Sequence, residues 1–65
     1  MPTKTNVHVQ LSGEDGNVFS IIGRVRKALG RAGYSEIAEE YVKACKKADS
    51  YDKVLQITME YVEVE

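Results

Sequence analysis

The sequence predicts an α+β fold, with an N-terminal strand followed by three helices and a short C-terminal strand (β-α-α-α-β). Between positions 6 and 11, apolar residues alternate with polar ones, which is typical of a strand with one buried face. From position 18 onward, apolar residues recur at spacings of three and four, which places them on one face of a helix. The chain has 65 residues, and a length of this size predicts one small domain spanning residues 1–65.

The first strand is predicted over residues 6–11. Val7, Val9 and Leu11 point to one side of it, and the polar residues between them point to the other. Residues 12–17 are rich in glycine, asparagine and acidic side chains, so we expect a turn there.

The first helix is predicted from residue 17 to about residue 32. Asn17 or Asp15 can cap its start by accepting a backbone hydrogen bond, and Gly33 can end it in a left-handed conformation. Its apolar stripe consists of Val18, Ile21, Ile22, Val25, Ala28, Leu29 and Ala32.

The second helix is predicted to follow directly, with Ser35 as its cap. Charged residues occupy its outer face. Its inner face consists of Ile37, Ala38, Tyr41, Val42, Cys45 and Ala48.

The last stretch of the chain fits two patterns. A helical face would consist of Val54, Leu55, Thr58, Met59 and Val62. A strand would alternate Leu55, Ile57, Met59 and Tyr61 with polar residues. We predict a helix over roughly residues 51–60 and a strand over 61–65, because a solitary N-terminal strand is unstable in water. The terminal strand could pair with the first one in the same chain or in a neighbouring chain, and an all-strand arrangement of residues 54–65 stays open.

Composition excludes several classes of protein. Cys45 is the only cysteine and His8 the only histidine, which rules out an intrachain disulfide and a structural zinc site. The lone thiol and the lack of a secretion signal predict an intracellular setting. No apolar run is long enough to cross a membrane. We therefore expect no metal, no cofactor and no membrane partner.

No catalytic residue is predicted. General-base work by His8 would need a group that orients the ring and a nearby nucleophile, and sequence spacing suggests neither. Cys45 falls on the inner stripe of the second helix, where a thiol is usually a small core group. We predict that the protein is not an enzyme, although a site shared between subunits remains an alternative.

Positive charge is concentrated in residues 18–32, although the whole chain carries a net charge of −1. Arg24, Lys27 and Arg31 share one side of the first helix. This row could be a solvated face neutralised by the acidic later helices, or a site for an acidic protein surface or a nucleotide phosphate. A helix-turn-helix DNA reader is less suitable, because the candidate second helix is apolar and acidic.

Two glycines interrupt the first helix. Gly23 and Gly30 lie in a row with Phe19 and Arg26, and each glycine costs a helix about 1 kcal/mol relative to alanine. Such a cost is accepted where another backbone must come close. Another helix of the chain could pack on this row, or the row could be a docking groove. The candidate partner-binding residues are Phe19, Gly23, Arg24, Arg26, Lys27, Gly30 and Arg31.

The pattern Asp-Gly-Asn-x-Phe-x-Ile-x-Gly at positions 15–23, with the ending at positions 59–64, resembles a group of small proteins carried by bacteriophages, prophages and mobile elements. The resemblance implies a setting in the cytoplasm of a bacterial host and does not imply an activity. Small proteins of such elements often bind and block a host component, defence systems included, which is an analogy only.

Our leading hypothesis is a small non-catalytic binding protein that contacts a host or phage protein through the first helix, with inhibition of a host defence component as one form of this function. The alternative is a nucleotide or nucleic-acid binder that uses the basic row. A homodimer formed through the N-terminal strand is a further option.

Overall fold

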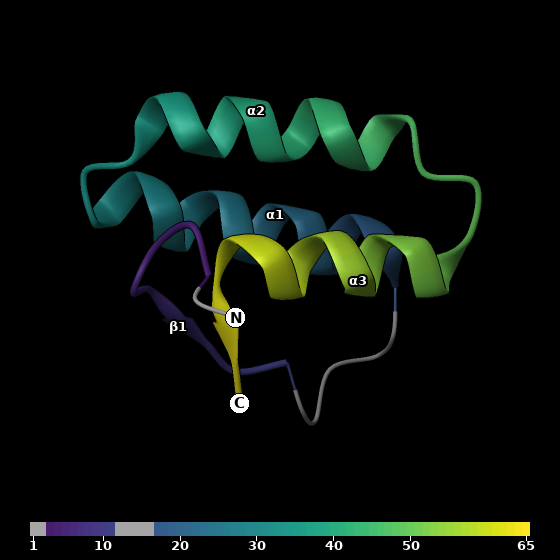
Figure 1. The fold of residues 1–65 in the computed structure, drawn as a ribbon, viewed down its shortest axis with the longest axis horizontal. Coiled ribbons are helices and arrows are strands. Elements are labelled where there is room, and N and C mark those ends of the chain that lie inside the picture. The colour runs from purple at the N-terminus through teal and green to yellow at the C-terminus, as the bar shows by residue number, and fades with distance from the viewer. Residues whose placement is uncertain (1–2, 12–16) are drawn as a thin grey trace.

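A computed structural model of the chain describes residues 3–11 and 17–65. It confirms the predicted order of one strand, three helices and one strand (Figure 1). The elements are β1 (His8–Val9), α1 (Val18–Arg31), α2 (Ser35–Lys46), α3 (Tyr51–Tyr61) and β2 (Glu63–Val64). The helices pack against one another, and the two strands contact α1 and α3.

The two strands form a parallel ladder in which His8 lies opposite Glu63. The backbone N–H of Glu63 donates to the carbonyl of Val7 at 2.8 Å, and that of Glu65 donates to the carbonyl of Val9 at 2.9 Å. The terminal segment therefore pairs with the first strand within the same chain. Both strands are shorter than the predicted ranges 6–11 and 61–65.

The ends of α1 agree with the predicted signals to within a residue. The side chain of Asn17 accepts a hydrogen bond from the N–H of Phe19 at 2.8 Å. After the helix, Gly33 adopts a φ of 91°, which favours glycine because it has no Cβ. The alternative cap Asp15 and residues 12–16 of the predicted turn lie outside the described residues.

The predicted cap of α2 is wrong, because Ser35 is the first residue of the helix itself. Gly33 turns the chain so tightly that the N–H of Tyr34 donates to the carbonyl of Leu29 at 2.8 Å. The carbonyl of Tyr34 then accepts the N–H of Ala38 at 2.8 Å. The second helix therefore starts one residue earlier than predicted, with Tyr34 as a cap whose side chain makes no capping hydrogen bond.

The last stretch is a helix followed by a strand, which excludes the all-strand alternative. The hydroxyl of Ser50 caps α3 by accepting the N–H of Lys53 at 3.2 Å. The helix continues to Tyr61 rather than 60, and the strand begins at Glu63 rather than 61. Tyr61 is buried, whereas Met59, which was assigned to the helical face, is 60% exposed. Val54, Thr58 and Tyr61 face the core at spacings of four and three.

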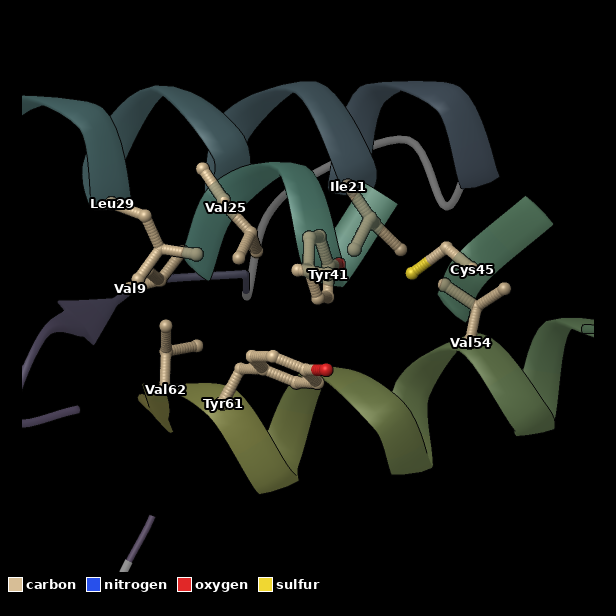
Figure 2. Close-up of a cluster of buried hydrophobic side chains, with 10 residues drawn as sticks. Val9, Ile21, Val25, Leu29, Tyr41, Cys45, Val54, Tyr61 and Val62 are labelled. Atoms are coloured by element: carbon tan, nitrogen blue, oxygen red, sulfur yellow. The ribbon is translucent and has the colours of Figure 1, made fainter. Parts of the chain in front are cut away.

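The core lies between the helices and the inner side of β1 (Figure 2). Its buried apolar residues are Val9, Ile21, Val25, Leu29, Ala38, Tyr41, Cys45, Val54, Tyr61 and Val62. Most of them come from the stripes predicted on the helices. Because these stripes point inward, the opposite faces of α1 remain available for contacts with other molecules.

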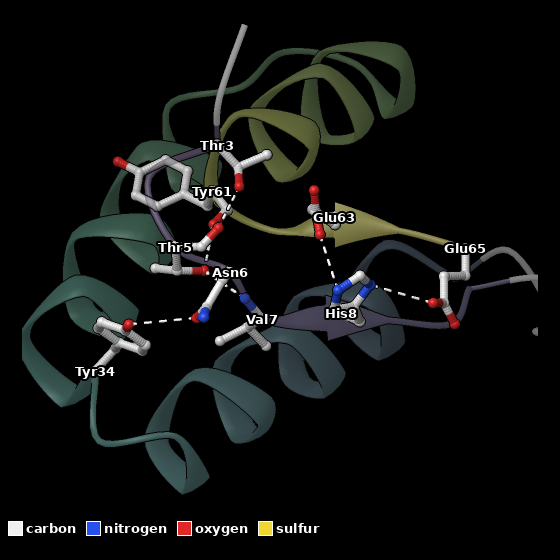
Figure 3. A network of polar contacts seen from close by, with 9 residues as sticks. All are labelled: Thr3, Thr5, Asn6, Val7, His8, Tyr34, Tyr61, Glu63 and Glu65. Carbon is white, nitrogen blue, oxygen red and sulfur yellow. Dashed lines mark hydrogen bonds and ion pairs between the residues drawn. The ribbon is translucent and has the colours of Figure 1, made fainter.

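The segment before β1 is fastened to the end of α3 (Figure 3). The hydroxyl of Thr5 donates to the carbonyl of Tyr61 at 2.7 Å, and the N–H of Lys4 donates to the carbonyl of Glu60 at 2.9 Å. The ammonium of Lys4 lies 4.7 Å from the centre of the Tyr61 ring and 3.2 Å from a carboxylate oxygen of Glu40. These contacts fix the position from which β1 starts.

Candidate binding site

A groove of about 850 Å³ runs between β1 and α1. Residues 7–10 form one wall of it. The other wall belongs to α1 and contains five of the predicted binding residues, namely Phe19, Gly23, Arg24, Lys27 and Arg31. The sequence thus indicated the helical wall but not the strand that faces it.

The α1 wall of the groove is open at Gly23. A Cβ placed on this glycine would meet no atom within 4 Å, and the same holds for Gly30. Phe19 is 83% exposed, the highest exposure among the large apolar side chains of the described residues. In the described part of the structure, no other helix packs on Phe19, Gly23 or Gly30.

The predicted row of Phe19, Gly23, Arg26 and Gly30 is divided between two depressions. Arg26 and Gly30 line a smaller one of about 350 Å³, together with Ser35, Ala38 and Glu39 of α2. The four residues share a face of α1, but they differ in position along its axis. Since α2 starts directly after α1, its first turns lie beside the C-terminal half of that face.

The described lining of the larger groove carries positive charge. Arg24, Lys27 and Arg31 line it, and none of the described lining residues is acidic. All three cations lie on the same side of α1, as their spacings of three and four predicted. Arg24 also takes part in a contact within the chain. Lys27 borders both depressions.

The side chain and the backbone of His8 face different sides of β1. Its ring lies between two carboxylates, with Nε2 2.9 Å from Glu63 and Nδ1 3.2 Å from Glu65 (Figure 3). Each ring nitrogen therefore lies within hydrogen-bond distance of a carboxylate oxygen. The ring is thereby held on the exposed face of the sheet.

The backbone of His8 faces the edge of β1 that is remote from β2. In a parallel ladder, alternate residues direct their N–H and C=O groups to the same partner strand. Backbone groups of Val7, Val9 and Leu11 form the hydrogen bonds to β2. The N–H and C=O groups of His8 therefore point away from β2. Among the described residues the sheet has only two strands, which leaves this edge of β1 without a neighbouring strand.

His8 and Cys45 are the two residues that the sequence raised as catalytic candidates. Sequence spacing suggested no group that orients the ring of His8, and the structure places the carboxylates of Glu63 and Glu65 beside it. Cys45 is buried, and burial raises the pKa of its thiol, which opposes formation of the reactive thiolate.

Comparison of the chain with protein-family models, curated proteins and solved structures gave no match. In the described residues, no three His, Cys, Asp or Glu side chains are grouped in a way that could hold a metal ion. None of the helices in that part of the chain combines the length and apolar character that a membrane crossing requires.

Proposed function

We propose that the chain is a small non-catalytic binding protein that recognises a partner protein through the groove between β1 and α1. The observation that carries this proposal is the open space at Gly23 beside the exposed ring of Phe19. A helical glycine with nothing packed on it weakens the fold by about 1 kcal/mol without any gain in packing. Close contact between Gly23 and a partner would explain why a glycine is present at this position.

The residue types in the groove suit protein recognition. Aromatic residues and arginines are enriched among the few side chains that dominate binding energy. Phe19 would be the apolar anchor, and Arg24 and Arg31 would set orientation and specificity. The resemblance to small proteins of phages and mobile elements supports a host or phage protein as the partner. Inhibition of a host defence component is one form that this function could take.

Two matched leucine variants test the proposal. The partner is first isolated by affinity purification of the tagged protein and identified by mass spectrometry. Its affinity is then measured by calorimetry for Gly23→Leu and Gly30→Leu. Both positions have open space, so both variants should fold. Only Gly23→Leu fills the groove, and we expect it to weaken binding tenfold or more, by about 1.4 kcal/mol.

Phe19→Ala should weaken binding to a similar degree, whereas Gly30→Leu should bind like the parent protein. Full affinity in Gly23→Leu, with circular dichroism unchanged, would contradict a partner in the groove. Loss of affinity in Gly30→Leu alone would move the site to the depression beside α2.

A second candidate function is binding of a nucleotide or single-stranded nucleic acid. It is favoured by the three cations in a groove whose described lining has no acidic residue. Each phosphate contact releases counterions, so affinity should fall steeply as salt rises. Titration with a labelled single-stranded oligonucleotide at low and high salt tests this function. Absence of binding, or binding that does not respond to salt, would exclude it.

A further inference from the structure

We infer that the partner is bound as an extended acidic peptide segment that adds to the sheet as a third strand along the groove edge of β1. This inference rests on the groove function proposed above and specifies the chemistry of its partner. Addition of a strand to an exposed sheet edge is a recurring mode of peptide recognition, in which backbone bonds give affinity and alternate side chains give specificity.

The backbone of β1 provides the first step of the argument. The ladder to β2 uses Val7, Val9 and Leu11, so the N–H and C=O of His8 face the groove wall. An edge that presents such groups is a template for another strand. The ring of His8 does not obstruct this edge, because Glu63 and Glu65 hold it on the exposed face of the sheet.

The charge of the α1 wall determines the composition of the segment. Arg24 and Arg31 are seven residues apart, which corresponds to about 10 Å along the helix, and Lys27 lies between them. Alternate side chains of a strand are about 7 Å apart. Two acidic residues at alternate positions of the segment could therefore both face this row, while the side chains between them point away from α1.

The apolar end of the groove adds a further requirement. Phe19 is exposed there, and the open space at Gly23 allows a backbone to approach α1 closely. We therefore expect an apolar residue in the segment to contact Phe19, in register with the acidic ones. This alternation of positions distinguishes a bound strand from a flexible acidic tail.

A second copy of the chain is a poorer occupant of the same edge. Pairing of two β1 strands would bring two rows of Arg24, Lys27 and Arg31 to one interface, and like charges across an interface disfavour association. A segment of opposite charge has no such cost. Charge complementarity thus favours an acidic partner over self-association.

Selection from a library of random ten-residue peptides tests the composition of the segment. We expect the selected peptides to carry Asp or Glu at alternate positions. Their affinity should fall tenfold or more in Lys27→Glu and Arg31→Glu. Lys46→Glu on α2, which changes charge equally outside the groove, should bind as the parent does. Selected peptides without acidic residues, or a library that yields no binder, would overturn the inference.

Backbone methylation of a selected peptide tests the strand pairing. N-methyl groups on the amides that face β1 should reduce affinity at least tenfold, while the same groups on the intervening amides should have little effect. Binding should also slow hydrogen exchange at the backbone amide of His8. Equal tolerance of both methylation patterns, or unchanged exchange at His8, would show that no strand is added.

The test separates the two proposals. If Gly23→Leu abolishes binding of the isolated partner but acidic peptides leave His8 exchange unchanged, the groove function stands and strand addition is wrong. Sedimentation that reveals a dimer formed through the same edge would instead assign the groove to a second copy. Salt-sensitive oligonucleotide binding that excludes the peptide would assign it to nucleic acid. Either result would overturn the acidic segment as occupant.

Discussion

The phenol oxygen of Tyr41 lies 2.7 Å from the hydroxyl oxygen of Thr58, and both residues are fully buried. The hydroxyl of Thr58 donates its own hydrogen to the carbonyl of Val54 at 2.8 Å. The phenol is therefore the donor between the two side chains. This chain of hydrogen bonds links α2 to α3 inside the apolar core and satisfies both hydroxyl groups.

The two partners of this bond should respond differently to substitution. Thr58→Val leaves the phenol of Tyr41 buried without its acceptor and should lower the free energy of unfolding by about 1–3 kcal/mol. Tyr41→Phe leaves Thr58 bonded to Val54 and should cost only about 1 kcal/mol. Urea denaturation of both variants measures this difference. A larger loss for Tyr41→Phe would contradict the direction of donation.

The open helical glycines predict a gain in stability. Gly23→Ala and Gly30→Ala should each raise the free energy of unfolding by about 0.5–1 kcal/mol, because the added methyl meets no atom and the unfolded chain loses freedom. Gly33→Ala is the matched control. Its φ of 91° should make it destabilising by about 1–2 kcal/mol. Thermal unfolding compares the stabilities of the three variants. A destabilised Gly23→Ala variant would mean that the space beside Gly23 is filled in solution.

We predict that protonation of Glu40 makes the folded protein less stable in acid. A hydrogen bond from the phenol of Tyr61 at 2.9 Å, followed by the ammonium of Lys4, holds the pKa of its carboxyl below the usual 4.5. A carboxyl with a lowered folded-state pKa stabilises the fold above its unfolded-state pKa, and this contribution disappears as the pH falls through the folded-state pKa.

Between about pH 6 and about pH 3, the parent protein should therefore lose more stability than Glu40→Gln does. Glu39→Gln, an exposed neighbour on the same helix, serves as the control and should retain the acid sensitivity of the parent. Denaturant midpoints at several pH values provide the measurement. Identical pH dependence in the parent and in Glu40→Gln would refute a role for this carboxyl.

We predict that the thiol of Cys45 reacts slowly in the folded protein. Its side chain is buried, and burial raises its pKa. Reaction with Ellman's reagent in native buffer should be roughly a hundredfold or more slower than in denaturant, because it requires opening of the core. In Ser35→Cys, the added exposed thiol should react at once and Cys45 slowly. Two fast thiols in that variant would show that the core around Cys45 opens readily.

Much of the fold could be predicted because local signals agreed with the final packing. The stripe of α1 that contains Val25 and Leu29 faces the core of the protein, and Asn17 caps this helix. Ser35 was assigned wrongly because the carbonyl of Tyr34 already accepts the N–H of Ala38, so that α2 begins at Ser35 directly after the turn at Gly33. Met59 was placed on the inner face of the third helix and Tyr61 in the terminal strand, because this stretch fitted both patterns. The packing of α3 instead exposes Met59 and buries Tyr61.

The candidate site was predictable on one side only. Helical spacing placed Arg24, Lys27 and Arg31 on a common face, and all three line the same groove. The strand wall depends on where β1 lies in space, and no periodicity in the sequence contains that information. The separation of Gly23 from Gly30 has the same origin, because it depends on how α2 returns along α1.

The direction of the strands also determines how the protein resists mechanical force. If residues 3 and 65 are pulled apart, β1 and β2 are drawn past each other along their length. The bonds from Glu63 to Val7 and from Glu65 to Val9 then bear the load together in shear, instead of opening one after another. Stretching in an optical trap should meet one abrupt yield point at this ladder, and the helices should extend only after it breaks.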